Sequence, residues 1–185
     1  MKIYTRQGDK GTSRLADGSC LDKNEGRFRV LGAVDELNSW LGLARALTED
    51  EEVKRFLQTR QEELFEASAE LSRGKGPTSL KLRGASAEKF SLRKVRQLEK
   101  EIDLWQKPLP QLKKFIYPGG DQRAAFLHLG RTVCRRVEQE LMGLKKEEAI
   151  NEKILIYFNR LSDWLFVLAR KINREKGVKE EVWKR

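Results

Sequence analysis

Arginine side chains recur along the segment IYPGGDQRAAFLHLGRTVCRRVEQE at positions 116–140, just after a Pro-Gly-Gly turn. Free backbone N–H groups and the dipole at the start of a helix favour a bound anion. Arginines also grip phosphate oxygens through paired hydrogen bonds, which lysines do less well. For an arbitrary helix the commoner explanation is a solvated, salt-bridged face. The segment is therefore a candidate phosphate site with an ordinary structural alternative.

Helical geometry places three of these charged groups together. Because each residue turns by about 100°, Arg131, Arg135 and Glu138 fall within roughly 60° of one another on one face of the predicted helix. The apolar residues of the opposite side are Phe126, Val133, Val137 and Leu141.

The segment YTRQGDKGTS at positions 4–13 is a second candidate for anion binding. Gly8 and Gly11 surround Asp9 and Lys10, and two hydroxyl residues follow. Small residues let backbone N–H groups approach a phosphate, and the lysine adds a positive charge. The spacing differs from that of a Walker A loop, and no strand precedes it.

Polar residues interrupt two apolar helical segments. The run ILIYFNRLSDWLFVLAR, positions 154–170, is apolar almost all round and predicts a buried helix, yet Asn159 and Asp163 share one of its faces. A buried carboxylate needs a partner, so Asp163 either pairs with an arginine inside the protein or contacts a ligand at a pocket wall. Asp35 and Asn38 interrupt an earlier helix in the same way, and Asp35 is expected to pair with an arginine within one chain or across a subunit boundary.

These side chains must be positioned by helices, because apolar residues repeat with helical spacing and no strand pattern is evident. Residues 72–89 read as a mobile surface loop and 106–120 as a long crossover. We expect an all-α, single-domain five-helix bundle with an ordered N-terminal glycine-containing loop. Its expected parts are a loop at 1–25, a bundle at 26–175 and a polar, frayed tail at 176–185. The predicted helices span approximately 27–47, 51–71, 87–105, 121–144 and 151–172.

Composition restricts the class of protein. The 185 residues are 39% hydrophobic, enough for one sizeable core. A formal charge of +10, from 38 basic and 28 acidic residues, favours an anionic partner such as a nucleotide, nucleic acid or membrane surface. The same charge is also typical of a protein with ion-paired helix surfaces. A basic, helical nucleic-acid-binding protein therefore remains an alternative.

Other classes are disfavoured by what the sequence lacks. The single histidine, His128, argues against a zinc site or a di-iron bundle, which needs paired Glu-x-x-His motifs. No long apolar run predicts a transmembrane helix, and the first residues have no apolar signal core. Cys20 and Cys134 are expected to be free thiols. We therefore expect a cytoplasmic protein that does not enter membranes.

Four segments occur in a fixed order: YTRQGDKGTS, LGAVDELNSWLG, IYPGGDQRAAFLHLGRTVCRRVEQE and YFNRLSDWLFVLAR. In this combination the chain resembles the PduO-type ATP:cob(I)alamin adenosyltransferases, also called corrinoid adenosyltransferases. The resemblance implies a five-helix bundle that forms a homotrimer, with active sites between neighbouring subunits. It implies transfer of the 5′-deoxyadenosyl group of ATP, with Mg²⁺, to the cobalt of reduced cobalamin and release of triphosphate.

The resemblance also implies residue roles. Asp35 and Arg131 are expected to form a salt bridge between subunits near the corrin, and Phe115 to crowd the lower cobalt face and expel its axial ligand. Glu138 is expected to hold ATP and its magnesium. The remaining nucleotide contacts implied are Thr5, Gly8, Asp9, Lys10, Gly11, Thr12, Lys23, Arg135, Arg136, Asn159 and Asp163.

The implied partners are ATP, a corrinoid, other copies of the chain, a reductase and an enzyme that uses adenosylcobalamin, with no role for nucleic acid or membranes. A catalytically inactive trimer that only carries corrinoid or nucleotide remains a further alternative.

Overall fold

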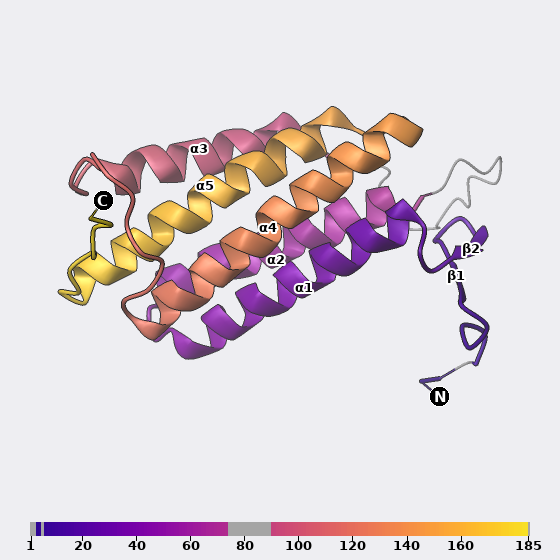
Figure 1. Ribbon diagram of the computed structural model, residues 1–185, viewed down its shortest axis with the longest axis horizontal. Coiled ribbons are helices and arrows are strands. Elements are labelled where there is room, and N and C mark those ends of the chain that lie inside the picture. The colour runs from indigo at the N-terminus through magenta and orange to yellow at the C-terminus, as the bar shows by residue number, and fades with distance from the viewer. Residues whose placement is uncertain (1–2, 5, 74–89, 185) are drawn as a thin grey trace.

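The computed structural model describes residues 3–4, 6–73 and 90–184, which form a helical bundle with a small hairpin at one end (Figure 1). The expected all-α, five-helix architecture is confirmed. No helix in this part of the chain is long and apolar enough to cross a membrane. The elements are β1 (Thr12–Arg14), β2 (Cys20–Asp22), α1 (Gly26–Leu47), α2 (Glu51–Leu71), α3 (Leu92–Gln106), α4 (Gln122–Glu147) and α5 (Glu152–Glu175).

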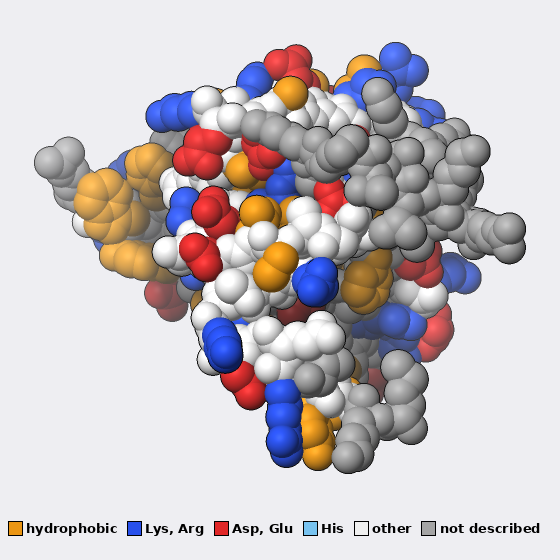
Figure 2. All heavy atoms as spheres, turned by 90° about the vertical axis from the view of Figure 1, so that its right-hand side faces the viewer, with side chains coloured by type: hydrophobic (Ala, Val, Ile, Leu, Met, Phe, Trp, Pro, Cys, Tyr) orange, Lys and Arg blue, Asp and Glu red, His pale blue; other side chains and the backbone are white. Residues whose placement is uncertain are grey.

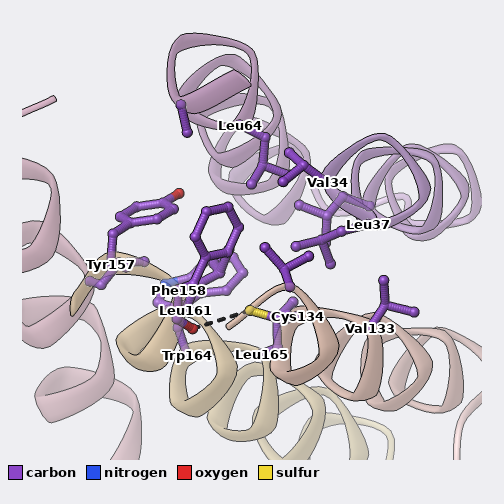
Figure 3. Packing of buried hydrophobic residues seen from close by; sticks show 14 of the residues in the cluster. Val34, Leu37, Leu64, Val133, Cys134, Tyr157, Phe158, Leu161, Trp164 and Leu165 are labelled. Carbon is purple, nitrogen blue, oxygen red and sulfur yellow. Dashed lines mark hydrogen bonds between the residues drawn. The ribbon is translucent and has the colours of Figure 1, made fainter. Parts of the chain in front are cut away.

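The helices pack through their apolar faces around one core. Helix α4 packs between α1 and α5, while α5 also packs on α3 and α1 on α2. Tyr157, Phe158 and Trp164 of α5 are fully buried among leucines of the other helices (Figure 3). Each fully buried large apolar side chain contributes about 1.5–3 kcal/mol. The Cys134 thiol donates to the Phe158 carbonyl at 3.2 Å and so links α4 to α5.

A buried polar cluster joins α2, α3 and α5. The Arg60 guanidinium lies 3.0 Å from Glu63 and 3.5 Å from Glu101. Tyr157 donates its hydroxyl to Glu63 at 2.8 Å, and the Trp164 indole N–H donates to Glu101 at 2.6 Å. Burial raises the pKa of Glu63, although Arg60 opposes this shift. The cluster therefore pairs buried opposite charges across three helices.

Capping side chains fix the starts of α2 and α5 where the sequence predicts them. Asp50 accepts hydrogen bonds from the backbone N–H groups of Glu52 and Val53, and Asn151 accepts one from Lys153. These caps satisfy N–H groups that have no partner within the helix.

Two expectations about strands and tail were wrong. Strands β1 and β2 pair antiparallel, with Thr12 opposite Asp22. Each strand has only three residues, which is too short to show an alternating pattern in the sequence. The tail is not frayed: Glu181 accepts from the Tyr117 N–H at 2.9 Å, and the Trp183 N–H donates to the Phe115 carbonyl at 2.8 Å. Pairing with the crossover holds the tail in place.

The third helix starts later than predicted. Phe90 and Ser91 precede α3 in non-helical conformation. The Phe90 N–H donates to Glu70 of α2 at 2.6 Å, and its ring is buried, so a tertiary contact holds the chain there. The predicted helix residues 87–89 and most of the predicted mobile loop at 72–89 lie outside the described residues.

Candidate functional site

A cavity of about 760 Å³ opens where the crossover, α4, α5 and the tail meet. Four residues singled out from distant parts of the sequence line it together: Phe115, Arg131, Arg135 and Asp163. The crossover supplies the first, α4 the two arginines and α5 the carboxylate. Its other lining residues are Leu112, Lys113, Lys114, Ile116, Pro118, His128, Ser162, Phe166 and Trp183. We refer to it as the arginine cavity.

Phe115 stands at the arginine cavity with little protein around it. Its side chain is 79% exposed, and its ring centroid lies 6.3 Å from that of Trp183. Leaving a phenylalanine in water forgoes the free energy of its burial. An aromatic ring held in this way is placed to contact a ligand rather than to stabilise the chain.

The two arginines of α4 concentrate positive charge on one wall. Arg131 lies over the Phe166 ring, 6.0 Å from its centroid, and its Nε has no hydrogen-bond partner among the described residues. Burial, and then the neighbouring Arg135, lower the pKa of Arg131. Such a pair costs free energy unless an anion neutralises it. The wall is therefore suited to a polyanion.

His128 lies behind this wall and was not predicted as a site residue. It is buried, with its ring 5.9 Å from that of Phe166. Burial, with a smaller contribution from Arg131, lowers its pKa from 6.5 to about 4. The imidazole is therefore neutral at pH 7 and adds no charge to the cavity.

At the start of α4 the Asp121 side chain already occupies one backbone N–H group that the sequence suggested for an anion. Asp121 caps the helix by accepting from the Arg123 N–H at 2.9 Å, and it also binds the Arg123 guanidinium at 2.7 Å. This hydrogen bond lowers the pKa of Asp121. Asn173 of α5 occupies the turn itself, donating to the Gly119 carbonyl at 2.9 Å. The turn thus fixes the crossover, and the candidate anion contacts lie farther along α4.

Asp163 is not buried, which corrects the reading of α5 as a helix enclosed on all sides. Its side chain is 55% exposed and forms an ion pair with Arg160 at 3.0 Å. Asn159, on the same outer face, donates to Glu138 of α4 at 3.0 Å. The pair Asn159 and Glu138 thus joins the two helices beside the arginine cavity. Among the described residues no group of three acidic, cysteine or histidine side chains is arranged to hold a metal ion.

Two other predicted residues lie on the α1 side. Arg136 is ion-paired with Glu36 of α1, so it points away from the wall that carries Arg135. Asp35 is exposed, and no ion pair joins it to Arg131 within the described chain. The expected salt bridge between Asp35 and Arg131 thus remains a prediction about two subunits.

The glycine loop forms a compact structure of its own. Gly11 has a φ of +82°, and its N–H donates to the Gly8 carbonyl at 3.3 Å. The Lys23 N–H donates to the Gly11 carbonyl at 2.8 Å, and the Lys23 ammonium would lie 3.1 Å from a Cβ atom on Gly8. Gly8, Gly11 and Lys23 thus meet, beside Thr12 at the start of β1.

The loop is far from the arginine cavity of its own chain. Asp9 and Lys10 are exposed at the end of the bundle that carries the hairpin, whereas the crossover lies at the opposite end (Figure 1). Thr5 lies outside the described residues. The predicted nucleotide contacts therefore form two groups, one in the loop at the hairpin end and one partway along α4 and α5.

The charge on the hairpin end is mixed. Basic and acidic side chains are interspersed over this face, without a continuous basic patch among the described residues (Figure 2). Several arginines elsewhere are ion-paired, including Arg27 with Glu148 at 2.5 Å. This distribution differs from the clustered basic face that nucleic-acid binding favours.

Comparison with known proteins gives consistent matches. The family described as "Cobalamin adenosyltransferase" matches residues 3–172. A cobalamin adenosyltransferase from Cupriavidus metallidurans is 45% identical, over 100% of this chain and 95% of the relative. A corrinoid adenosyltransferase from Bacillus subtilis is 39% identical, over 100% of this chain and 93% of that protein.

Solved structures agree with the sequence relatives. A variant PduO-type ATP:corrinoid adenosyltransferase from Lactobacillus reuteri, complexed with cobalamin and ATP, superposes with a TM-score of 0.89, covers all of both chains and is 36% identical. Another variant from the same organism, complexed with ATP, has a TM-score of 0.86 and 36% identity, covering 98% of this chain and 100% of that one.

Proposed function

This chain belongs to the cobalamin adenosyltransferase family, and we propose that it transfers the 5′-deoxyadenosyl group of ATP to the cobalt of a reduced corrinoid at a site built by two copies of the chain. The observation that carries this proposal is the arginine cavity. There an exposed aromatic from the crossover faces two adjacent arginines from α4.

The reaction makes defined demands on the protein. The cobalt electron pair forms the bond to C5′ of the ribose, and the C5′–O bond breaks as triphosphate leaves with its electrons. Reduced cobalt is a strong nucleophile, so no side-chain base is needed. The protein must align cobalt with C5′ and stabilise the charge on the departing triphosphate.

Arg135 is the residue assigned to the triphosphate, with Arg131 beside it at the corrin. Both line the arginine cavity, and neither forms an ion pair with another described residue. Because their positive charges are already in place, they stabilise the leaving group without reorganisation at the moment of reaction. Asn159 and Glu138, joined by a hydrogen bond on the adjoining face, are assigned to the nucleotide.

Glu138 is the carboxylate assigned to the magnesium ion that accompanies ATP. The described residues offer no dedicated metal cluster, so triphosphate oxygens and water must supply the other ligands. This matches the preference of Mg²⁺ for one or two carboxylates together with substrate phosphates.

Phe115 is assigned to the lower face of the corrin. Its ring is 79% exposed and borders the arginine cavity. A ring in that position excludes both the axial base and water from the cobalt. Without its lower ligand the cobalt is easier to reduce, which makes the reactive state accessible.

The glycine loop of a neighbouring copy completes the site. In one chain the glycine loop adjoins the β1–β2 hairpin, at the end of the bundle opposite to the crossover (Figure 1). A loop and a cavity that serve one ATP must then come from different chains. The exposed apolar side chains of Leu129 and Met142 on α4 and Ile156 on α5 provide a surface for contact with another chain.

We assign the assembly as a homotrimer, in which Asp35 of one chain pairs with Arg131 of the next. A reductase that supplies the electron and an enzyme that consumes the coenzyme are the other partners of this activity. The test is to incubate the protein with ATP, Mg²⁺ and chemically reduced cobalamin. A light-sensitive adenosylated product is expected; no product, with Co(I) shown to be present, would refute catalysis.

A further inference from the structure

A second cavity, of about 660 Å³, lies beside the arginine cavity. Its walls are the crossover from Leu109 to Ile116, the end of α5 and the tail. We refer to it as the tail cavity. None of the residue roles assigned above uses it.

The paired crossover and tail lie between the two cavities, and the crossover residues Leu112, Lys113, Lys114 and Ile116 line both. Ile116 bridges to Val182 in antiparallel pairing, and successive side chains of extended chain point to opposite faces. Phe115 and Trp183 accordingly line the arginine cavity, whereas Val182 lines the tail cavity. The thin wall that carries Phe115 is therefore shared by both.

The tail cavity combines an apolar lining with uncompensated positive charge. Lys113, Lys114, Arg174 and Lys179 line it, all are exposed, and no ion pair joins any of them to another described residue. Its apolar residues are Leu109, Leu112, Ile116, Val178 and Val182.

The acidic residue that lines the tail cavity is already used. Glu180 binds the buried Arg170 at 2.6 Å, and Arg170 also donates to the Pro110 carbonyl at 2.8 Å. Glu180 therefore does not neutralise the four cations, which can interact with an anionic ligand. Apolar walls with a cationic rim fit a molecule that is apolar at one end and anionic at the other, and fit a free inorganic anion less well.

We propose that the tail cavity binds the nucleotide loop of a complete corrinoid after Phe115 has displaced its base from the cobalt. This inference rests on the proposed function. The loop carries an apolar heterocyclic base joined to the corrin through a ribose phosphodiester, which is an anion. The apolar walls take the base, and the phosphodiester lies among the four cations. Binding the displaced loop keeps the base away from the cobalt, so the tail cavity selects complete corrinoids.

The experiment compares cobalamin with cobinamide, which has the same ring but no nucleotide loop. In the Arg174→Gln/Lys179→Gln variant, both changes lie in the tail cavity and outside the arginine cavity. We expect KM for cobalamin to rise roughly three- to tenfold, the loss from two surface ion contacts. KM for cobinamide, KM for ATP and kcat should stay within about twofold of wild type, since only the loop-binding contacts are lost.

Two further measurements sharpen the comparison. Lys179→Glu, which reverses a charge, should raise KM for cobalamin above the value for Lys179→Gln. Lys100→Gln, on the exposed side of α3, should change KM for neither cobalamin nor cobinamide. Added salt should raise the wild-type KM for cobalamin more steeply than that for cobinamide.

Equal changes in KM for both corrinoids, or no change for cobalamin in the double and charge-reversed variants, would overturn this inference and leave the proposed function intact. A wild-type protein that adenosylates neither corrinoid would overturn both.

Discussion

The side-chain amide of Asn173 lies directly against Gly120: a Cβ atom built on the glycine would be 2.3 Å from the Asn173 Oδ1. The same Oδ1 accepts from the Asp121 N–H at 2.8 Å. Gly120 has a φ of +101°, which other residues rarely adopt. The end of α5 therefore fixes the turn between the segment that carries Phe115 and the helix that carries the arginines.

Gly120→Ala should destabilise the protein through this contact. Backbone strain and the displaced Asn173 amide together should lower the free energy of unfolding by about 2 kcal/mol or more. Gly119→Ala is the matched control, since nothing lies within 4 Å of its added Cβ, and it should change stability by less than about 0.5 kcal/mol. Urea denaturation at one fixed protein concentration measures both. Equal stability of the two variants would contradict the role of Asn173.

Arg135→Ala should reduce kcat/KM for ATP by about a hundredfold or more, the usual cost of removing a preorganised group that stabilises a leaving group. Arg135→Lys should recover part of the loss, because charge remains but the paired hydrogen bonds do not. Arg93→Ala, on the exposed side of α3, is the control. Steady-state kinetics with pre-reduced corrinoid would disprove the assignment if Arg135→Ala and Arg93→Ala behaved alike.

Phe115→Ala should separate the two stages of the reaction. Starting from Co(II), the variant should lose most of its rate, because the lower ligand stays on the cobalt and hinders reduction. Starting from pre-reduced Co(I), which binds no lower base, the loss should be much smaller. Phe65→Ala removes a comparably exposed ring, 65% accessible on α2, and should alter neither rate. Equal losses from both starting states would refute the role of Phe115.

His128 should make stability depend on pH. Its pKa is lowered from 6.5 to about 4 in the folded protein, so its contribution is fully present above pH 6.5 and is lost as the pH falls toward 4. The difference amounts to roughly 3 kcal/mol. His128→Phe should flatten the stability profile between these pH values relative to wild type. Urea midpoints at several pH values measure this, and parallel profiles would contradict it.

Local periodicity was sufficient to predict the helices. The apolar rows of α1, α2, α4 and α5 repeat with helical spacing, and Asp50 caps α2 where the pattern begins. Features fixed by distant partners were not predictable in this way. The tail is ordered by Phe115 and Tyr117, more than sixty residues earlier in the chain, and the two strands of the hairpin are only three residues long.

For the same reason, only part of the candidate site was predictable from the sequence. The residue types and their helical spacing correctly predicted that Arg131 and Arg135 share one face of α4. The structure shows that Phe115 and Asp163 line the same cavity as these arginines. Periodicity left Asp163 either paired with an arginine inside the protein or at a pocket wall, and the structure places it, 55% exposed, beside Arg160 and at the arginine cavity. Asn173 gave no signal, since one polar residue at a helix end is ordinary in sequence.

In the proposed assembly one ATP is held by the arginine cavity of one chain and the glycine loop of another. Two inactive variants test it when co-expressed: Lys10→Ala/Lys23→Ala, which retains the cavity, and Arg135→Ala, which retains the loop. In a trimer with sites between chains, random mixing leaves about one site in four with both halves intact, so about a quarter of wild-type activity should return. A mixed assembly as inactive as its two parents would contradict a site shared between two chains.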